Sequence, residues 1–176
     1  MNEIIKKNAI TFGIISGTIS ILITTIIYVI NVEYFVSIWA GLIGLTFSVT
    51  IACVLLSKTK KEIKKDFTFK EAFTTYFLMA IIGILISTVF SILLFNFIDP
   101  SLKETIKELT LKSVSSMMQK FGGKTADVNK ALKQIQETDQ FSIISQIKGI
   151  LTSIVVTSIF GLILAAFFKT PTRNEI

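Results

Sequence analysis

The sequence predicts an all-α protein, a four-helix transmembrane bundle with an extracytoplasmic amphipathic helical hairpin between helices 3 and 4. Four long segments without a single charged residue or histidine run approximately from Ala9–Ile30, Tyr34–Ser57, Ala72–Ile98 and Gly149–Phe168. A helix rises about 1.5 Å per residue and a bilayer core is about 30 Å thick, so each segment is long enough to cross. The whole chain, residues 1–176, is therefore expected to form one integral membrane domain. Its extramembrane helical module should span about residues 99–140.

The first apolar segment follows a short basic start, as in a signal peptide. The segment is longer than a typical signal core, and no small-residue cleavage site follows at Val29–Val36, so we interpret it as an uncleaved span. Only Asn31–Glu33 separates it from the second segment, so these two spans should form an antiparallel hairpin. Cys53 is the only cysteine, which excludes an intrachain disulfide.

The polar stretch after the third span carries helix signals. Asp99 and Pro100 suit the N-cap and first helical position, and Gly122-Gly123 suits the helix end. Apolar residues recur at roughly helical spacing between them, and we select six as a candidate partner-facing surface: Leu102, Ile106, Leu109, Met117, Met118 and Phe121. A second helix is predicted from Thr125, and from Asp139 one helix should continue into the fourth span. The apolar faces of this module can fold back on the bundle, lie in the headgroup layer or contact another protein or ligand.

Basic residues of the short loops predict the orientation. They cluster before the first span (Lys6, Lys7), between spans two and three (Lys58, Lys60, Lys61, Lys64, Lys65, Lys70) and in the tail (Lys169, Arg173), whereas Asn31–Glu33 has none. All three clusters fall on one side of a four-span protein, which indicates an N-in, C-in topology in the cytoplasmic membrane. Five of these lysines are candidates for contact with anionic lipid headgroups: Lys58, Lys60, Lys61, Lys64 and Lys65. No basic helix with interleaved aromatics is present, so nucleic acid is not expected as a partner.

Small residues repeat every fourth position on the fourth span, at Gly149, Ser153, Thr157, Gly161 and Ala165. Shorter series lie on the third span (Gly83, Ser87, Ser91) and the first (Gly13, Gly17). In lipid, such stripes let helix backbones approach closely. The stripe on the fourth span therefore predicts helix packing within the chain or, alternatively, a homodimer seam.

Most catalytic chemistry is missing from this composition. The chain has no histidine and one cysteine, which argues against haem ligation, histidine-based zinc sites and Ser-His catalysis. No span contains a carboxylate for proton relay or a proline break that would expose helix ends to ions. We therefore expect no catalytic residues, no cofactor and no metal. A lipid-modifying enzyme would require carboxylates such as Glu33 and Asp99 to converge on one pocket.

Two junctions of the third span resemble a known family. The span opens with Phe67-Thr68-Phe69-Lys70-Glu71-Ala72-Phe73 and closes with Phe95-Asn96-Phe97-Ile98-Asp99-Pro100, while the last span ends in Gly161–Lys169. With the amphipathic segment between them, the whole chain resembles the DUF4199 family, small four-span proteins mostly from Bacteroidota. One departure is the polar start of the last span, with Ser142, Ser145 and Gln146. The resemblance implies an inner-membrane location and four spans, and it implies no activity.

We therefore predict a non-catalytic accessory or interaction subunit of a bacterial envelope complex. The alternative is a conduit or carrier for a small or lipidic solute. That alternative requires a cavity between the spans lined by some of the following hydroxyl residues: Thr24, Thr25, Ser48, Thr50, Ser87, Thr88 or Thr157.

Overall fold

The structure is a computed structural model that describes residues 2–63, 66–122 and 124–171. Within these ranges the chain forms helices and turns without a β-strand, so the predicted all-α fold is confirmed. In chain order the elements are α1 (Glu3–Ile30), the 3₁₀ helix η1 (Val32–Val36), α2 (Ile38–Ile63), α3 (Phe69–Leu93), the π-helical turn η2 (Leu94–Ile98), α4 (Leu102–Lys120), α5 (Thr125–Glu137) and α6 (Ile143–Phe168).

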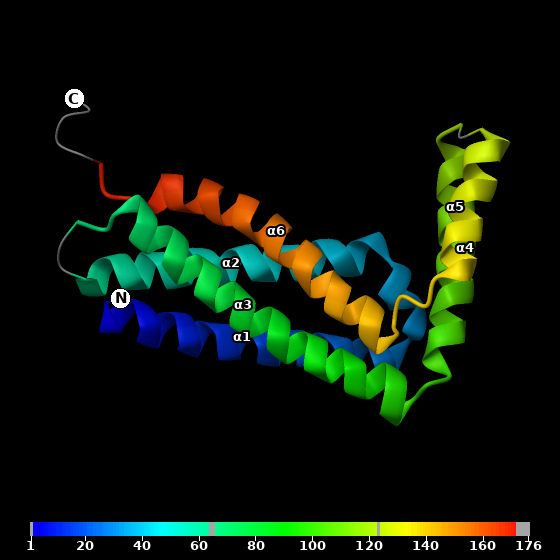
Figure 1. The fold of residues 1–176 in the computed structure, drawn as a ribbon, viewed down its shortest axis with the longest axis horizontal. Helices are drawn as coiled ribbons and strands as arrows, with labels where there is room; N and C mark the ends of the chain where they lie inside the picture. Colours follow the sequence, from blue (N-terminus) through cyan, green and yellow to red (C-terminus); the bar gives the residue numbers. More distant parts are fainter. Residues whose placement is uncertain (1, 64–65, 123, 172–176) are drawn as a thin grey trace.

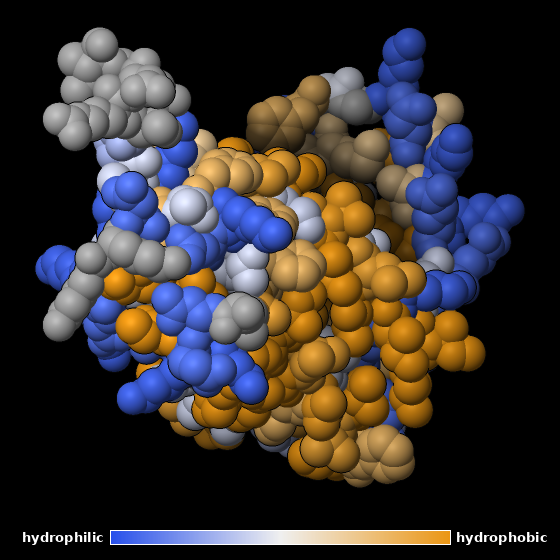
Figure 2. All heavy atoms as spheres, turned by 60° about the vertical axis from the view of Figure 1, so that its left-hand side comes forward, coloured by the Kyte–Doolittle hydropathy of each residue, from blue (hydrophilic) through white to orange (hydrophobic). Residues whose placement is uncertain are grey.

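Four helices in the described ranges are long and apolar enough to cross a membrane, namely α1, α2, α3 with η2, and α6. In Figure 1 they lie lengthwise beside one another, and α6 ends where α1 begins. We call this the N-terminal end of the bundle and the opposite end, where α4 begins, the hairpin end. Figure 2 turns the N-terminal end toward the viewer and shows hydrophilic residues gathered there, with hydrophobic residues along the flank. These features indicate a multi-pass membrane protein.

Side-chain caps fix the starts of three of these helices. The Asn2 side chain accepts a hydrogen bond from the Ile4 amide at 2.9 Å, and α1 therefore begins at Glu3. At α3, Thr68 and Glu71 form a reciprocal capping box. The Ser142 hydroxyl accepts from the Ser145 amide at 3.2 Å at the start of α6. These caps supply partners for amides that the first helical turn leaves unpaired.

Three predicted boundaries are wrong, each because a polar side chain organises a local turn. The second helix begins at Ile38 rather than Tyr34, since the Asn31 side chain caps the intervening 3₁₀ helix η1. The helix α4 begins at Leu102, two residues late, because the Asp99 carboxylate accepts from the Ser101 amide. The last helix begins at Ile143 rather than Asp139. The predicted end of α4 and start of α5 are confirmed, with Gly122 at a φ of 71° and α5 starting at Thr125.

The helix pair α1–α3 has the most extensive contact in the bundle. Gly13 and Gly17 of α1 are buried against α3, and Gly83 of α3 is buried against Ser16 of α1. The absent side chains let the two backbones approach closely, which is how helices associate in lipid.

The larger apolar core of the bundle lies toward its N-terminal end. There α2 contributes Ala52, Leu55 and Leu56, all fully buried, to a core that also contains Ile5, Phe67, Ala72 and Ala165. The first half of α2 behaves differently, since almost every residue from Gly41 to Thr50 is exposed. The helices α2 and α6 also contact each other only sparsely. The second half of α2 is therefore held in the packed core, while its first half is separated from it.

The helices α4 and α5 pack against each other and lie crosswise over the hairpin end of the bundle (Figure 1). The base of α4 is anchored there, because Leu102 and Ile106 are buried with Leu94 and Phe95 in a second apolar cluster. This anchoring places the remainder of the α4–α5 pair beside the ends of the four spans.

Candidate functional site

A cavity of about 250 Å³ lies between the four spans, where α2 has separated from its neighbours. We call it the cleft. Its hydroxyl-bearing lining comes from all four helices: Ser16, Ser20 and Thr24 of α1, Ser48 of α2, Tyr76 and Ser87 of α3, and Thr157 of α6. The rest of its wall is apolar or glycine, including Ile19, Ile23, Phe47, Ile51, Met79 and Ile84. Of the seven hydroxyl residues that the sequence predicts for such a lining, Thr24, Ser48, Ser87 and Thr157 line the cleft, whereas Thr25, Thr50 and Thr88 do not.

A second cavity of about 400 Å³ continues the cleft toward the hairpin end. We call it the vestibule. The two cavities share Ser20, Thr24 and Ser87 as lining residues. The vestibule wall is mostly polar and adds Thr88, Ser91, Gln140, Ser145, Gln146 and Ser153, with Phe141, Gly149 and Ile150. Together the cavities reach the size range of small-molecule sites, roughly 300–1,000 Å³.

Most hydroxyls of the cleft lining have no hydrogen bond to their own helix, although Ser87 bonds to the Ile84 carbonyl at 3.0 Å. Three exposed threonines do bond back to their own helix: Thr25 to the Ile21 carbonyl, Thr46 to Leu42 and Thr50 to Thr46, each at 2.8 Å. Among the described residues, the hydroxyls of Ser16, Ser20, Thr24, Ser48 and Thr157 have no such hydrogen bond. None of them is sealed in the interior, because no buried side-chain nitrogen or oxygen of the described residues lacks a hydrogen-bond partner, so each can bond to a molecule in the cleft. The lining hydroxyls therefore favour a polar occupant in the cleft.

The described wall of both cavities is uncharged. Serine and threonine hydroxyls donate as well as accept hydrogen bonds, and the amides of Gln140 and Gln146 add further donors and acceptors. The described residues also contain no group of three His, Cys, Asp or Glu side chains that could hold a metal ion. The arrangement can therefore bind polar, uncharged groups.

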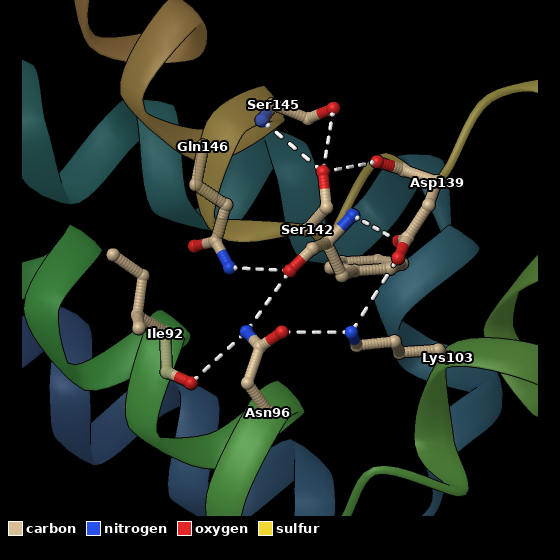
Figure 3. Close-up of polar contacts among 8 residues, drawn as sticks. Ile92, Asn96, Lys103, Asp139, Ser142, Ser145 and Gln146 are labelled. Carbon is tan, nitrogen blue, oxygen red and sulfur yellow. Dashed lines mark hydrogen bonds and ion pairs between the residues drawn. The ribbon is translucent and has the colours of Figure 1, made fainter.

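A polar network closes the outer rim of the vestibule (Figure 3). The Asn96 amide donates to the Ile92 carbonyl at 3.1 Å and to the Phe141 carbonyl at 3.0 Å, while Lys103 donates to the Asn96 Oδ1 at 2.7 Å. Lys103 also pairs with Asp139 at 3.4 Å. We call these contacts the rim network. It joins η2, the first turn of α4 and the segment before α6, so the α4–α5 pair is tied directly to the vestibule wall.

The π-helical turn η2 helps to place Asn96 in this network. The Asp99 amide donates to the Leu94 carbonyl at 2.9 Å, five residues back, which closes the wider turn. Asp99 in turn accepts hydrogen bonds from Ser101 and, at 3.2 Å, from the Tyr28 hydroxyl. The bonds from Ser101 hold the pKa of the Asp99 carboxyl below its usual range, with a smaller contribution from Tyr28 and partial opposition from desolvation.

The N-terminal end of the cleft is closed by the packed core. Beyond that core, the Asn8 side chain donates to Thr59 at 3.2 Å and to the Glu62 carboxylate at 2.7 Å. Across the same end, the Phe67 amide donates to the Thr170 hydroxyl at 3.0 Å and the Thr170 amide to the Phe67 carbonyl at 2.8 Å. The two cavities thus form a blind recess that ends at this core.

The stripe predicted on the fourth span divides into two parts. Gly161 and Ala165 are buried, and Gly161 lies against Phe73 and Tyr76 of α3. Thr157 lines the cleft, Ser153 lines the vestibule, and Gly149 is exposed with open space beside it. The regular spacing therefore serves helix contact over its second half and cavity lining over its first.

The six residues proposed for a partner also divide. Leu102 and Ile106 are buried at 5% and 3% exposure on the bundle end and are not available to a partner in this structure. Leu109 and Met118 are half-buried. Met117 and Phe121, at 40% and 85%, present exposed side chains.

The lysines proposed for lipid contact lie in different surroundings. Lys61 is exposed, Lys58 lies 5.5 Å from the centre of the Phe12 ring and 3.9 Å from Glu62, and Lys60 donates to the Lys169 carbonyl at 3.4 Å. Lys64 and Lys65 fall outside the described residues.

Sequence reasoning missed Ser16 and Ser20 as cavity residues. Their spacing held the signal, because Ser16, Ser20 and Thr24 repeat every fourth residue and so form one hydroxyl stripe on α1. The stripe runs beside the buried Gly13 and Gly17.

Comparison with known proteins places the chain in a family without adding a function. No curated protein and no solved structure matched the chain. A family model described as "Protein of unknown function (DUF4199)" matches residues 11–170. The chain therefore belongs to the DUF4199 family.

Proposed function

We propose that the protein is a non-catalytic membrane protein that binds and carries a small uncharged or lipidic solute in the cleft. The observation that carries this proposal is a cavity between the spans that is lined by hydroxyl groups from all four helices. Thr24 lines both cavities with its hydroxyl unpaired, whereas the adjacent Thr25 faces outward and bonds to its own helix. Because the Thr24 hydroxyl has no partner in the described part of the protein, it can donate and accept hydrogen bonds with a molecule in the cleft.

The test compares molecules that remain bound after gentle purification. Wild-type protein extracted in mild detergent should carry a discrete small molecule, detected by native mass spectrometry. Thr24→Val should lower its occupancy, since the substitution keeps the shape and removes the hydroxyl. Thr25→Val is the matched control and should retain the molecule. An empty wild-type protein, or equal occupancy in both variants, would contradict the proposal.

An accessory role through the α4–α5 pair is the second candidate. It is favoured by the exposed Phe121 and Met117 near the end of α4, which suit contact with another membrane protein or a second copy. A photo-crosslinking residue at Phe121 should capture one discrete partner in cells, while the same residue at the exposed Glu108 should not. A purified monomer with no crosslink at Phe121 would remove this candidate.

We further propose a bacterial cytoplasmic membrane location with the N-terminal end of the bundle inside the cell. The lysines at that end, including Lys6, Lys7, Lys61 and Lys70, support this orientation and contact with anionic headgroups. In a Cys53→Ala background, Lys7→Cys should resist an impermeant maleimide in intact cells, and Lys130→Cys should react. The opposite pattern would reverse the orientation.

A further inference from the structure

We infer that the occupant of the cleft is an uncharged lipid, with a hydroxyl-bearing head in the vestibule and a hydrocarbon chain in the cleft. This inference rests on the proposed solute-binding function and narrows it to one chemical class. A diacylglycerol is a representative member of that class.

The charge of the lining selects an uncharged head. Neither cavity has a charged side chain in its described wall, and the nearest ion pair, Lys103 with Asp139, belongs to the rim network. A phosphate or ammonium head in either cavity would lose its hydration without gaining a counter-charge, which is strongly unfavourable. An uncharged head can instead exchange hydrogen bonds with Thr24, Ser87 and Ser91, which both donate and accept.

Polarity changes with depth in the direction that an amphiphile requires. The vestibule wall is mostly hydroxyl and amide, and Phe141 and Ile150 are its only large apolar side chains in the described wall. The cleft adds a majority of apolar contacts, including Ile23, Phe47 and Met79. A head near the hairpin end and a chain directed toward the centre of the bundle therefore match the two compartments.

The route of entry favours a molecule that is already in the membrane. Phe47 and Ser48 line the cleft and are also exposed on the side of the bundle, with Phe47 at 49%. The neighbouring contact between α2 and α6 is sparse. The cleft thus communicates laterally with lipid, while the packed core blocks its N-terminal end. A chain can enter sideways without crossing water.

The inference can be tested with ligands that share acyl chains and differ in the head. Purified full-length protein in nanodiscs is titrated with diacylglycerol, with phosphatidic acid of the same chains, and with glycerol alone. Displacement of a fluorescent diacylglycerol probe measures each affinity. We expect diacylglycerol to bind at least tenfold more tightly than phosphatidic acid, and glycerol to give no displacement. Thr24→Val should weaken probe binding about fivefold, as expected for one hydrogen bond of about 1 kcal/mol, whereas Thr24→Ser and Thr25→Val should retain it.

The outcomes separate the lipid class from the general function. If phosphatidic acid or glycerol competes as well as diacylglycerol, and Thr24→Val still weakens probe binding, the uncharged-lipid assignment is wrong and solute binding stands. If the probe binds equally to wild type and Thr24→Val, or only water occupies the cleft, both proposals fail. Thr24→Ser guards against misfolding, because it keeps the hydroxyl at the same position.

Discussion

Adding one methyl group at Gly13 should destabilise the bundle, because Gly13 lies at the closest approach of α1 and α3. An alanine Cβ there would lie 2.7 Å from the Ile82 Cβ and 2.9 Å from the Met79 carbonyl oxygen. Carbon contacts are normally about 3.5–4.0 Å. The Met79 oxygen is part of the backbone, so a side-chain rotation cannot relieve that contact.

The expected cost follows from two opposing effects. Overpacking of a close contact costs about 1–3 kcal/mol. Replacing glycine with alanine in a helix returns about 0.5–1 kcal/mol through lower backbone freedom in the unfolded chain. The net loss for Gly13→Ala should therefore be about 1 kcal/mol and not exceed about 2.5 kcal/mol, and a loss of about 1 kcal/mol is a fivefold fall in the folded-to-unfolded ratio.

Pulse proteolysis across an SDS titration in mixed micelles measures this ratio. Gly41→Ala on α2 is the matched control, since a Cβ there would meet nothing within 4 Å. It should leave the midpoint unchanged or raise it slightly. Equal midpoints for Gly13→Ala and Gly41→Ala would refute the close α1–α3 contact.

Three further predictions concern the hairpin end. Gly122→Ala should lower the free energy of unfolding by about 1 kcal/mol, because Gly122 has a φ of 71° that disfavours a residue with a Cβ. Hydrogen exchange in the last turn of α4 should therefore increase. Lys103→Met should weaken the rim network by about 1 kcal/mol and speed amide exchange at Ser145, while Lys112→Met should not. The pKa of Asp99 is lower in the folded protein than its ordinary value of 3.8. The Asp99 carboxylate therefore stabilises the fold fully at a pH above 3.8, and this stabilisation is lost as the pH falls through the pKa of the folded state. Asp99→Asn should therefore flatten the acid limb of a pH–stability curve, and an unchanged limb would contradict this.

The uncharged spans were predictable from the sequence because the membrane core disfavours charged residues along the whole length of a span. Local turn chemistry was partly predictable, as Gly122 shows. The start of α4 was not, because Asp99 can cap a helix or form a turn with Ser101, and sequence alone does not distinguish these roles.

The cleft could be predicted only as a set of candidate residues. Thr24 and Thr25 are adjacent, and hydropathy gives them the same value, yet they face opposite environments. Which one faces inward depends on how α1 is rotated against α3, and Gly13 and Gly17 determine that rotation through contacts with Ile82 and Ile86. The separation of the part of α2 that precedes Ile51 is a further tertiary property, since no local signal in the uncharged part of this helix marks where its packing begins.

The connection between Phe67 and Thr170 has a consequence for the order of assembly. During synthesis at about 5–20 residues per second, α6 follows α3 into the membrane several seconds later. Phe67, in the short segment before α3, is therefore synthesised well before Thr170. Its hydrogen bonds to Thr170 form only after α6 is in place. Until then α1 and α3 must hold the incomplete bundle through their glycine contact. The entry of α6 into the membrane thus adds Thr157 to the lining of the cleft and allows the hydrogen bonds at the N-terminal end to form in the same event.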